Sequence, residues 1–162
     1  MIDATIDDHS PNLLVTLTGT EIDHRLVREA GAYATGRGSQ LVLLRVMSER
    51  EFAGRQGVYA RIKDLPEYTL VQAEERGRLS AARIGHEALV AVDVEFTAVG
   101  VVGSEADQIV DAAQAYDCAH VFLAERPRSL LRRLFARDLV SGSRAQFRRA
   151  RHRLADRVQW ED

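Results

Sequence analysis

Short apolar runs alternate with helix-like stretches along most of this chain, and that alternation constrains its fold more than any other feature. Asn12–Leu17 is a nearly continuous apolar run, typical of a strand buried on both faces of a parallel sheet, and residues 40–46 form a second such run. Between them, apolar residues from Ile22 to Tyr33 recur at helical spacing, which predicts an amphipathic helix over residues 21–35. The three segments predict a β-α-β unit with a right-handed crossover.

Turn and cap signals mark the ends of these elements. Thr20, followed three residues later by Asp23, resembles a capping arrangement at the start of the first helix. Gly103-Ser104 predicts a turn and a cap before a later helix, and residues 120–124 form another buried apolar run.

The middle of the chain carries weaker signals. Residues 47–66 mix charges with glycines and have no clean period, so we expect an irregular loop there. Residues 67–90 are helix-like, and residues 93–98 alternate strictly, as in a strand with one wetter face. The expected inner face of the middle helix consists of Leu70, Val71, Leu79, Ala82 and Leu89.

These elements predict one domain over residues 11–162, preceded by a flexible tail at residues 1–10. Strands that alternate with helices favour a three-layer α/β/α sandwich around a mostly parallel sheet of about five strands. Residues 147–157 are basic and are expected to be helical or extended in solvent. A short last strand is expected only at Arg157–Trp160.

Composition excludes several classes of protein. The chain has 162 residues, 46% of them apolar, with no run long enough to cross a membrane and no basic-then-apolar leader before Ser10. Cys118 is the only cysteine, which excludes an intrachain disulfide and a cysteine-based zinc site. We therefore expect a cytoplasmic protein.

Three segments resemble the universal stress protein family. LLVTLTGTE at 13–21 is similar to the family's opening strand and turn, and LVLLRVM at 41–47 to its second strand. The stretch VVGSEADQIVDAAQAYDCAHVFLA at 101–124 resembles its turn and helix running into the fourth strand, and is the most specific of the three. The resemblance implies a small Rossmann-like fold of the adenine-nucleotide-hydrolase type, usually a dimer and often an ATP-binding protein.

The resemblance also implies where ATP would bind. In nucleotide-binding members an aspartate ends the opening strand and glycines form a phosphate loop after the fourth. Here Thr18 takes the aspartate's place, and an ungapped alignment puts Ala124, Pro127, Arg137 and Asp138 at the two loop glycines and the closing Gly-Ser pair. An alignment with a five-residue insertion keeps Gly142-Ser143 as that pair. Proline has no amide to donate and an aspartate repels phosphate, so the sequence predicts no ATP binding of the usual kind.

Topology still predicts a crevice at the carboxyl ends of the strands, and two readings of it stay open. In the first, the chain is a regulatory or stress-response domain with no cofactor. In the second, it binds an adenine nucleotide, ATP or AMP, with arginines and Gly142-Ser143 holding the phosphates. The nucleotide-binding candidates are Thr18, Gly19, Val46, Gly103, Ala124, Arg126, Gly142 and Ser143.

Charge separation along the chain supports a third hypothesis for the function of this protein. Residues 126–162 hold 11 basic and 4 acidic side chains, against 11 basic and 20 acidic in residues 1–125. The arginine-rich segment 126–157 predicts either an interaction module for an acidic partner or a solvated basic face that pairs with the acidic remainder of the chain or with another subunit. Charge patterning favours the solvated face over nucleic-acid binding. No catalytic or metal-binding motif is found. His86-Glu87 begins like the motif of a metalloprotease helix, but Val90 stands where that motif has its second histidine.

Overall fold

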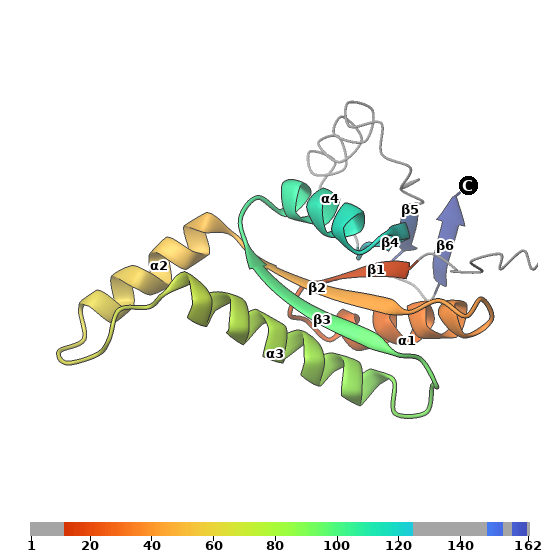
Figure 1. The fold of residues 1–162 in the computed structure, drawn as a ribbon, viewed down its shortest axis with the longest axis horizontal. Coiled ribbons are helices and arrows are strands. Elements are labelled where there is room, and N and C mark those ends of the chain that lie inside the picture. The colour runs from red at the N-terminus through yellow and green to blue at the C-terminus, as the bar shows by residue number, and fades with distance from the viewer. Residues whose placement is uncertain (1–11, 125–148, 154–156, 162) are drawn as a thin grey trace, which may run out of the picture.

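The computed structural model describes residues 12–124, 149–153 and 157–161 (Figure 1). The expected tail at residues 1–10 and most of the arginine-rich segment lie outside the described residues. The elements are β1 (Asn12–Leu17), α1 (Ile22–Thr35), β2 (Leu41–Met47), α2 (Glu49–Ala60), α3 (Leu70–Ala88), β3 (Phe96–Val102), α4 (Glu105–Ala115), β4 (Cys118–Phe122), β5 (Arg149–Arg153) and β6 (Arg157–Glu161).

The strands form one sheet in the order β3-β2-β1-β4-β5-β6. The pairings among β1, β2, β3 and β4 are parallel, and β5 joins β4 in parallel through Val121 and Arg149. β6 pairs antiparallel with β5. The predicted mostly parallel α/β fold is confirmed, with one strand more than expected. Arg157–Trp160 lies in β6, and the segment predicted to be helical or extended contains β5.

Two apolar clusters hold the helices on opposite faces of the sheet (Figure 1). On one face, Leu13 and Leu43 pack with residues of α1 and α3, including Leu26. On the other face, Leu14 and Leu44 pack with residues of α4. Alternate residues of β1 and β2 thus serve both clusters, which is why these strands are almost uniformly apolar and why the predicted three layers are present.

The prediction of an irregular loop over residues 47–66 is wrong, because α2 occupies most of it. The Ser48 hydroxyl caps this helix by accepting a hydrogen bond from the Glu51 amide at 3.1 Å. α2 projects away from the sheet (Figure 1) and has no buried residue. A helix that buries no face needs no apolar period, so the period was absent from the sequence.

The predicted inner face of α3 is largely wrong too. Leu70, Val71 and Leu79 are 49%, 73% and 54% exposed, whereas the buried residues of α3 are Ala73, Ala81, Ile84, Gly85 and Ala88. Small residues are required there because α3 packs almost directly on the backbone of β3. A Cβ on Gly77 would lie 3.2 Å from the Cα of Gly100.

Two strands are displaced from their predicted positions. β3 covers residues 96–102 instead of 93–98, and β4 covers residues 118–122 instead of 120–124. In β3, Phe96 and Ala98 pack toward α3 while Val99 and Val101 pack toward α4. The strand is therefore apolar on both faces, whereas the strict alternation predicted a strand with one face exposed to solvent.

Candidate functional site

A cavity of about 380 Å³ lies at the carboxyl ends of the parallel strands, where the topology predicted a crevice. Three of the sequence candidates line it together: Thr18 after β1, Val46 in β2 and Gly103 after β3. The remaining lining residues are Leu17, Arg45, Ser48, Glu51 and Glu105, which the sequence did not single out.

The loop after β1 is closed by Asp23, a completely buried aspartate in the first turn of α1. Its Oδ1 accepts hydrogen bonds from the Thr18 amide at 2.7 Å and from the Thr18 hydroxyl at 2.8 Å. Its Oδ2 accepts one from the Gly19 amide at 2.6 Å. The backbone amides of Thr18 and Gly19, which an open loop would offer to a ligand, are therefore already hydrogen-bonded within the chain. The predicted capping arrangement at Thr20 is wrong, because the N-cap residue of α1 is Glu21, which has no side-chain cap, and Asp23 bonds to Thr18 and Gly19 instead.

Gly19 lies directly against the guanidinium group of Arg45. Its φ is +80°, a left-handed conformation that favours glycine, and a Cβ at this position would lie 2.6 Å from the Arg45 Nη2. The Arg45 Nη1 donates to the carbonyl oxygen of Leu17 at 3.4 Å. The crevice floor thus carries a cation beside Thr18, the position where the resemblance puts an aspartate.

The other candidates divide between the crevice wall, the core and the undescribed segment. The Gly103 amide donates to the Met47 carbonyl at 2.9 Å, which joins the ends of β3 and β2 at the crevice. Ala124 is 4% exposed and packs in the core cluster on the α1 and α3 face, so it does not line the cavity. Arg126, Gly142 and Ser143 lie outside the described residues.

A second cavity, of about 210 Å³, shares Arg45 and Glu51 with the first. It lies among α2, α3 and the ends of β2 and β3. Its other lining residues are Met47, Arg55, Ala73, Arg76, Gly77, Ser80 and Val101.

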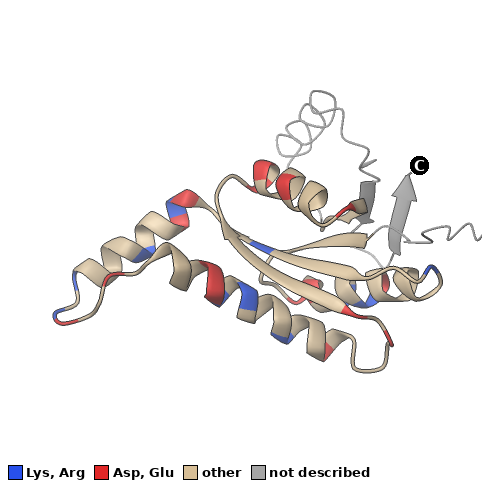
Figure 2. Ribbon diagram, in the orientation of Figure 1, with Lys and Arg blue, Asp and Glu red and all other residues tan. Residues whose placement is uncertain are grey.

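The sequence carried a signal for this region. Arg45 is the only charged residue in β1, β2, β3 and β4, and Figure 2 shows this single basic position within the otherwise uncharged strands. A charge inside a buried strand must be hydrogen-bonded, paired or solvated by a cavity. That reasoning would have pointed to LVLLRVM.

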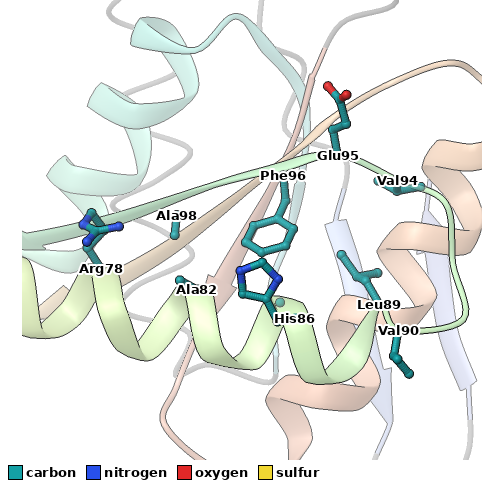
Figure 3. A pocket seen from close by; sticks show the side chains of 10 residues that line it. Arg78, Ala82, His86, Leu89, Val90, Val94, Glu95, Phe96 and Ala98 are labelled. Carbon is teal, nitrogen blue, oxygen red and sulfur yellow. The ribbon is translucent and has the colours of Figure 1, made fainter.

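A wider groove of about 640 Å³ runs between α3 and β3 at the edge of the sheet (Figure 3). The His86 ring packs edge-on against Phe96, with the ring centroids 5.0 Å apart, and Arg78 lies at the end of the groove away from Val90 and Val94. Arg78 is paired with Glu75, its Nε donating to Oε2 at 2.8 Å. The groove is thus lined mainly by packing contacts and holds no arrangement of a nucleophile with a base.

Nucleophilic and metal chemistry find little support among the described residues. Cys118 is 2% exposed, and burial, followed by the charge of Asp117, raises the pKa of its thiol to about 12. The thiol is therefore protonated and inaccessible at neutral pH. In the part of the chain that the structure describes, no group of three or more His, Cys, Asp or Glu side chains is placed to hold a metal ion. No described helix is long and apolar enough to cross a membrane.

The model of the universal stress protein family matches residues 10–150. A search of curated protein sequences found no match.

Solved structures share the fold at low sequence identity. One is a universal stress protein in complex with cAMP, 14% identical, with a TM-score of 0.51 over 79% of this chain and 90% of its own. A second is the Archaeoglobus fulgidus universal stress protein in complex with dAMP, 20% identical, with a TM-score of 0.51 over 78% and 90%. A third, a hypothetical protein whose biochemical function was assigned from its structure, is 16% identical, with a TM-score of 0.55 over 78% and 90%.

Proposed function

Because this chain belongs to the universal stress protein family, we propose that it is a regulatory stress-response domain that does not hold ATP in the family's usual way. The observation that carries this proposal is the closed loop after β1. Thr18 replaces the aspartate expected from the resemblance, and Asp23 already binds the amides of Thr18 and Gly19. Arg45 then occupies the space above Gly19.

The proposal includes no catalysis. It is supported by Cys118, whose buried and protonated thiol cannot attack a substrate. The domain would act in the cytoplasm by binding other molecules, and it would signal through a change in which molecule is bound.

Titration calorimetry with ATP and with AMP tests the proposal, after a denatured sample has been checked for nucleotide that co-purifies. We expect no saturable binding up to millimolar nucleotide. Micromolar binding, or nucleotide carried through purification, would overturn it. A Thr18→Asp variant is the matched comparison, because it restores the carboxylate of the nucleotide-binding members without changing the phosphate segment.

A second candidate function is adenine nucleotide binding, favoured by the structural neighbours solved with cAMP and with dAMP. In that case the phosphates would be held by Arg126 and by Gly142-Ser143. ATP binding that disappears in Gly142→Val, and persists in a matched Gly36→Val variant at an exposed helix end, would favour it.

The partner is also a proposal. Family members are usually dimers, which suggests a homodimer, and the arginine-rich segment 126–157 suggests an acidic partner. In this chain β6 pairs with β5 along its length, so a dimer formed at that end of the sheet would meet through β6. Light scattering after size exclusion measures the mass, and a salt-sensitive association would indicate contacts through the basic segment.

A further inference from the structure

The 210 Å³ cavity among α2, α3 and the ends of β2 and β3 contains more positive charge than its own residues neutralise. Three arginines line it, Arg45, Arg55 and Arg76, against one carboxylate, Glu51. Arg55 and Glu51 form an ion pair at 3.2 Å within α2. Two guanidinium groups are left without a carboxylate among the described residues, and they come from different layers of the fold.

Arg45 and Arg76 differ in exposure, and together they give the cavity a deep and a shallow side. Arg45 is half-buried in β2, and its stem packs 3.7 Å from the Cβ position of Gly77. Arg76 is exposed on α3 and reaches the cavity from the solvent side. A half-buried cation with one long hydrogen bond, to Leu17, retains most of its five N–H donors for another acceptor.

Such an arrangement costs free energy unless an anion or water satisfies the donors. Two other arginines of these helices form ion pairs, Arg78 with Glu75 and Arg55 with Glu51. Arg45 and Arg76 differ from other arginines in lining one cavity together, with no carboxylate partner among the described residues.

We propose that this cavity binds a small phosphate-bearing anion between Arg45 and Arg76. Guanidinium groups bind phosphate through paired N–H donors, and the Ser80 hydroxyl adds a further donor from α3. The volume limits the ligand's size, because pockets for drug-sized ligands measure about 300–1,000 Å³. The cavity therefore fits a phosphate or diphosphate group rather than a whole nucleotide. This cavity shares Arg45 and Glu51 with the Thr18 crevice, and its other lining residues lie outside that crevice.

Inorganic pyrophosphate is the probe, titrated into the full chain at low ionic strength and followed by calorimetry and by amide NMR signals. We expect saturable binding, with the largest shifts at Gly77 and Ser80. Arg76→Gln should weaken binding tenfold or more. Arg83→Gln is the matched control, since Arg83 is also exposed on α3 but does not line the cavity, and it should change binding less than twofold.

Arg45→Gln should weaken binding at least as much as Arg76→Gln, and a thermal melt of each variant checks that it is folded. The exposed Arg76 keeps the test valid if the Arg45 variant unfolds. Orthophosphate and AMP distinguish a free phosphate from a phosphate ester. No saturable pyrophosphate binding at millimolar concentration, or equal losses in the Arg76 and Arg83 variants, would overturn the proposal. Adenosine, which carries no phosphate, reports on the Thr18 crevice alone, so failure of the two proposals can be told apart.

Discussion

Asp23 is the residue on which the shape of the crevice depends most. Its carboxylate accepts three hydrogen bonds from Thr18 and Gly19, at 2.6 to 2.8 Å, inside a buried turn. Asp23→Ala would leave those donors without an acceptor, and we expect it to lower the free energy of unfolding by roughly 2–4 kcal/mol. Urea denaturation measures the change. Asp111→Ala, at an exposed position on α4, is the control and should cost under about 0.5 kcal/mol. Equal losses in the two variants would contradict this role for Asp23.

Cys118 should make stability fall at alkaline pH. Burial raises the pKa of its thiol in the folded state to about 12, whereas an unfolded cysteine has a pKa of about 8.5. Above the lower value the unfolded chain releases the proton while the folded chain retains it, so unfolding becomes easier as pH rises toward 12. Denaturation of the wild type and of Cys118→Ala between pH 8 and pH 11 isolates the effect. Parallel pH profiles for the two proteins would show that the thiol does not contribute.

Thiol reactivity gives an independent reading of the same burial. At neutral pH the native protein should react with Ellman's reagent only as fast as it opens, and the unfolded protein should react at once. Rapid reaction of the folded chain would mean that Cys118 is accessible.

Two glycine substitutions should have opposite effects, because one glycine lies in the close contact between α3 and β3 and the other lies in α2 with open space around it. A Cβ on Gly100 would overlap the Glu74 carbonyl oxygen and the Arg78 amide nitrogen, both backbone atoms. Gly100→Ala should therefore cost about 3 kcal/mol or more. Gly54→Ala, inside α2 with open space around its Cβ position, should stabilise the protein by about 0.5–1 kcal/mol because alanine favours helix. Thermal melts compare the two. Mild loss in Gly100→Ala would mean that the two backbones are farther apart.

Which elements the sequence could predict depends on the kind of side chain that each element buries. β1 and β2 bury continuous apolar residues and α1 buries one largely apolar face, so their patterns gave nearly correct bounds. α3 packs through Gly77 and its alanines, residues that a hydrophobic period does not reveal, and its inner face was predicted wrongly. α2 escaped prediction because its stability depends on a cap at Ser48 and on ring contacts rather than on a buried face.

The candidate site was predicted only in outline. Topology alone placed Thr18, Val46 and Gly103 at one crevice, because parallel strands must end together. Two side chains give the crevice its chemistry. Arg45 could have been found as the one charge in an apolar strand, whereas Asp23 needed the three-dimensional distances. Asp23 acts through contacts with residues four and five positions earlier, a spacing that the cap motif did not include.

Across the whole molecule, stability should be uneven, with α2 at the low end. The helix has no buried residue. The rings of Phe52 and Tyr59 pack against the ring of Tyr68, with centroid distances of 5.7 and 4.9 Å. Hydrogen exchange should therefore be much faster in α2 than in β2, whose residues 41–44 are buried. Tyr68→Ala should accelerate exchange in α2 further while leaving β2 slow. Equal protection of α2 and β2 would show that the helix opens only with the whole domain.

This uneven stability connects α2 to the arginine cavity. Glu51 and Arg55 of α2 form one wall, so each local opening of the helix also opens the proposed anion site. A ligand that binds only the closed form lowers the open population in proportion to its saturation. Pyrophosphate should thus slow hydrogen exchange in α2 of the wild type and not in Arg76→Gln, while exchange in β4, away from the cavity, stays the same. Slowing of both elements together would indicate general stabilisation instead, and unchanged exchange at saturating pyrophosphate would mean that α2 does not gate the site.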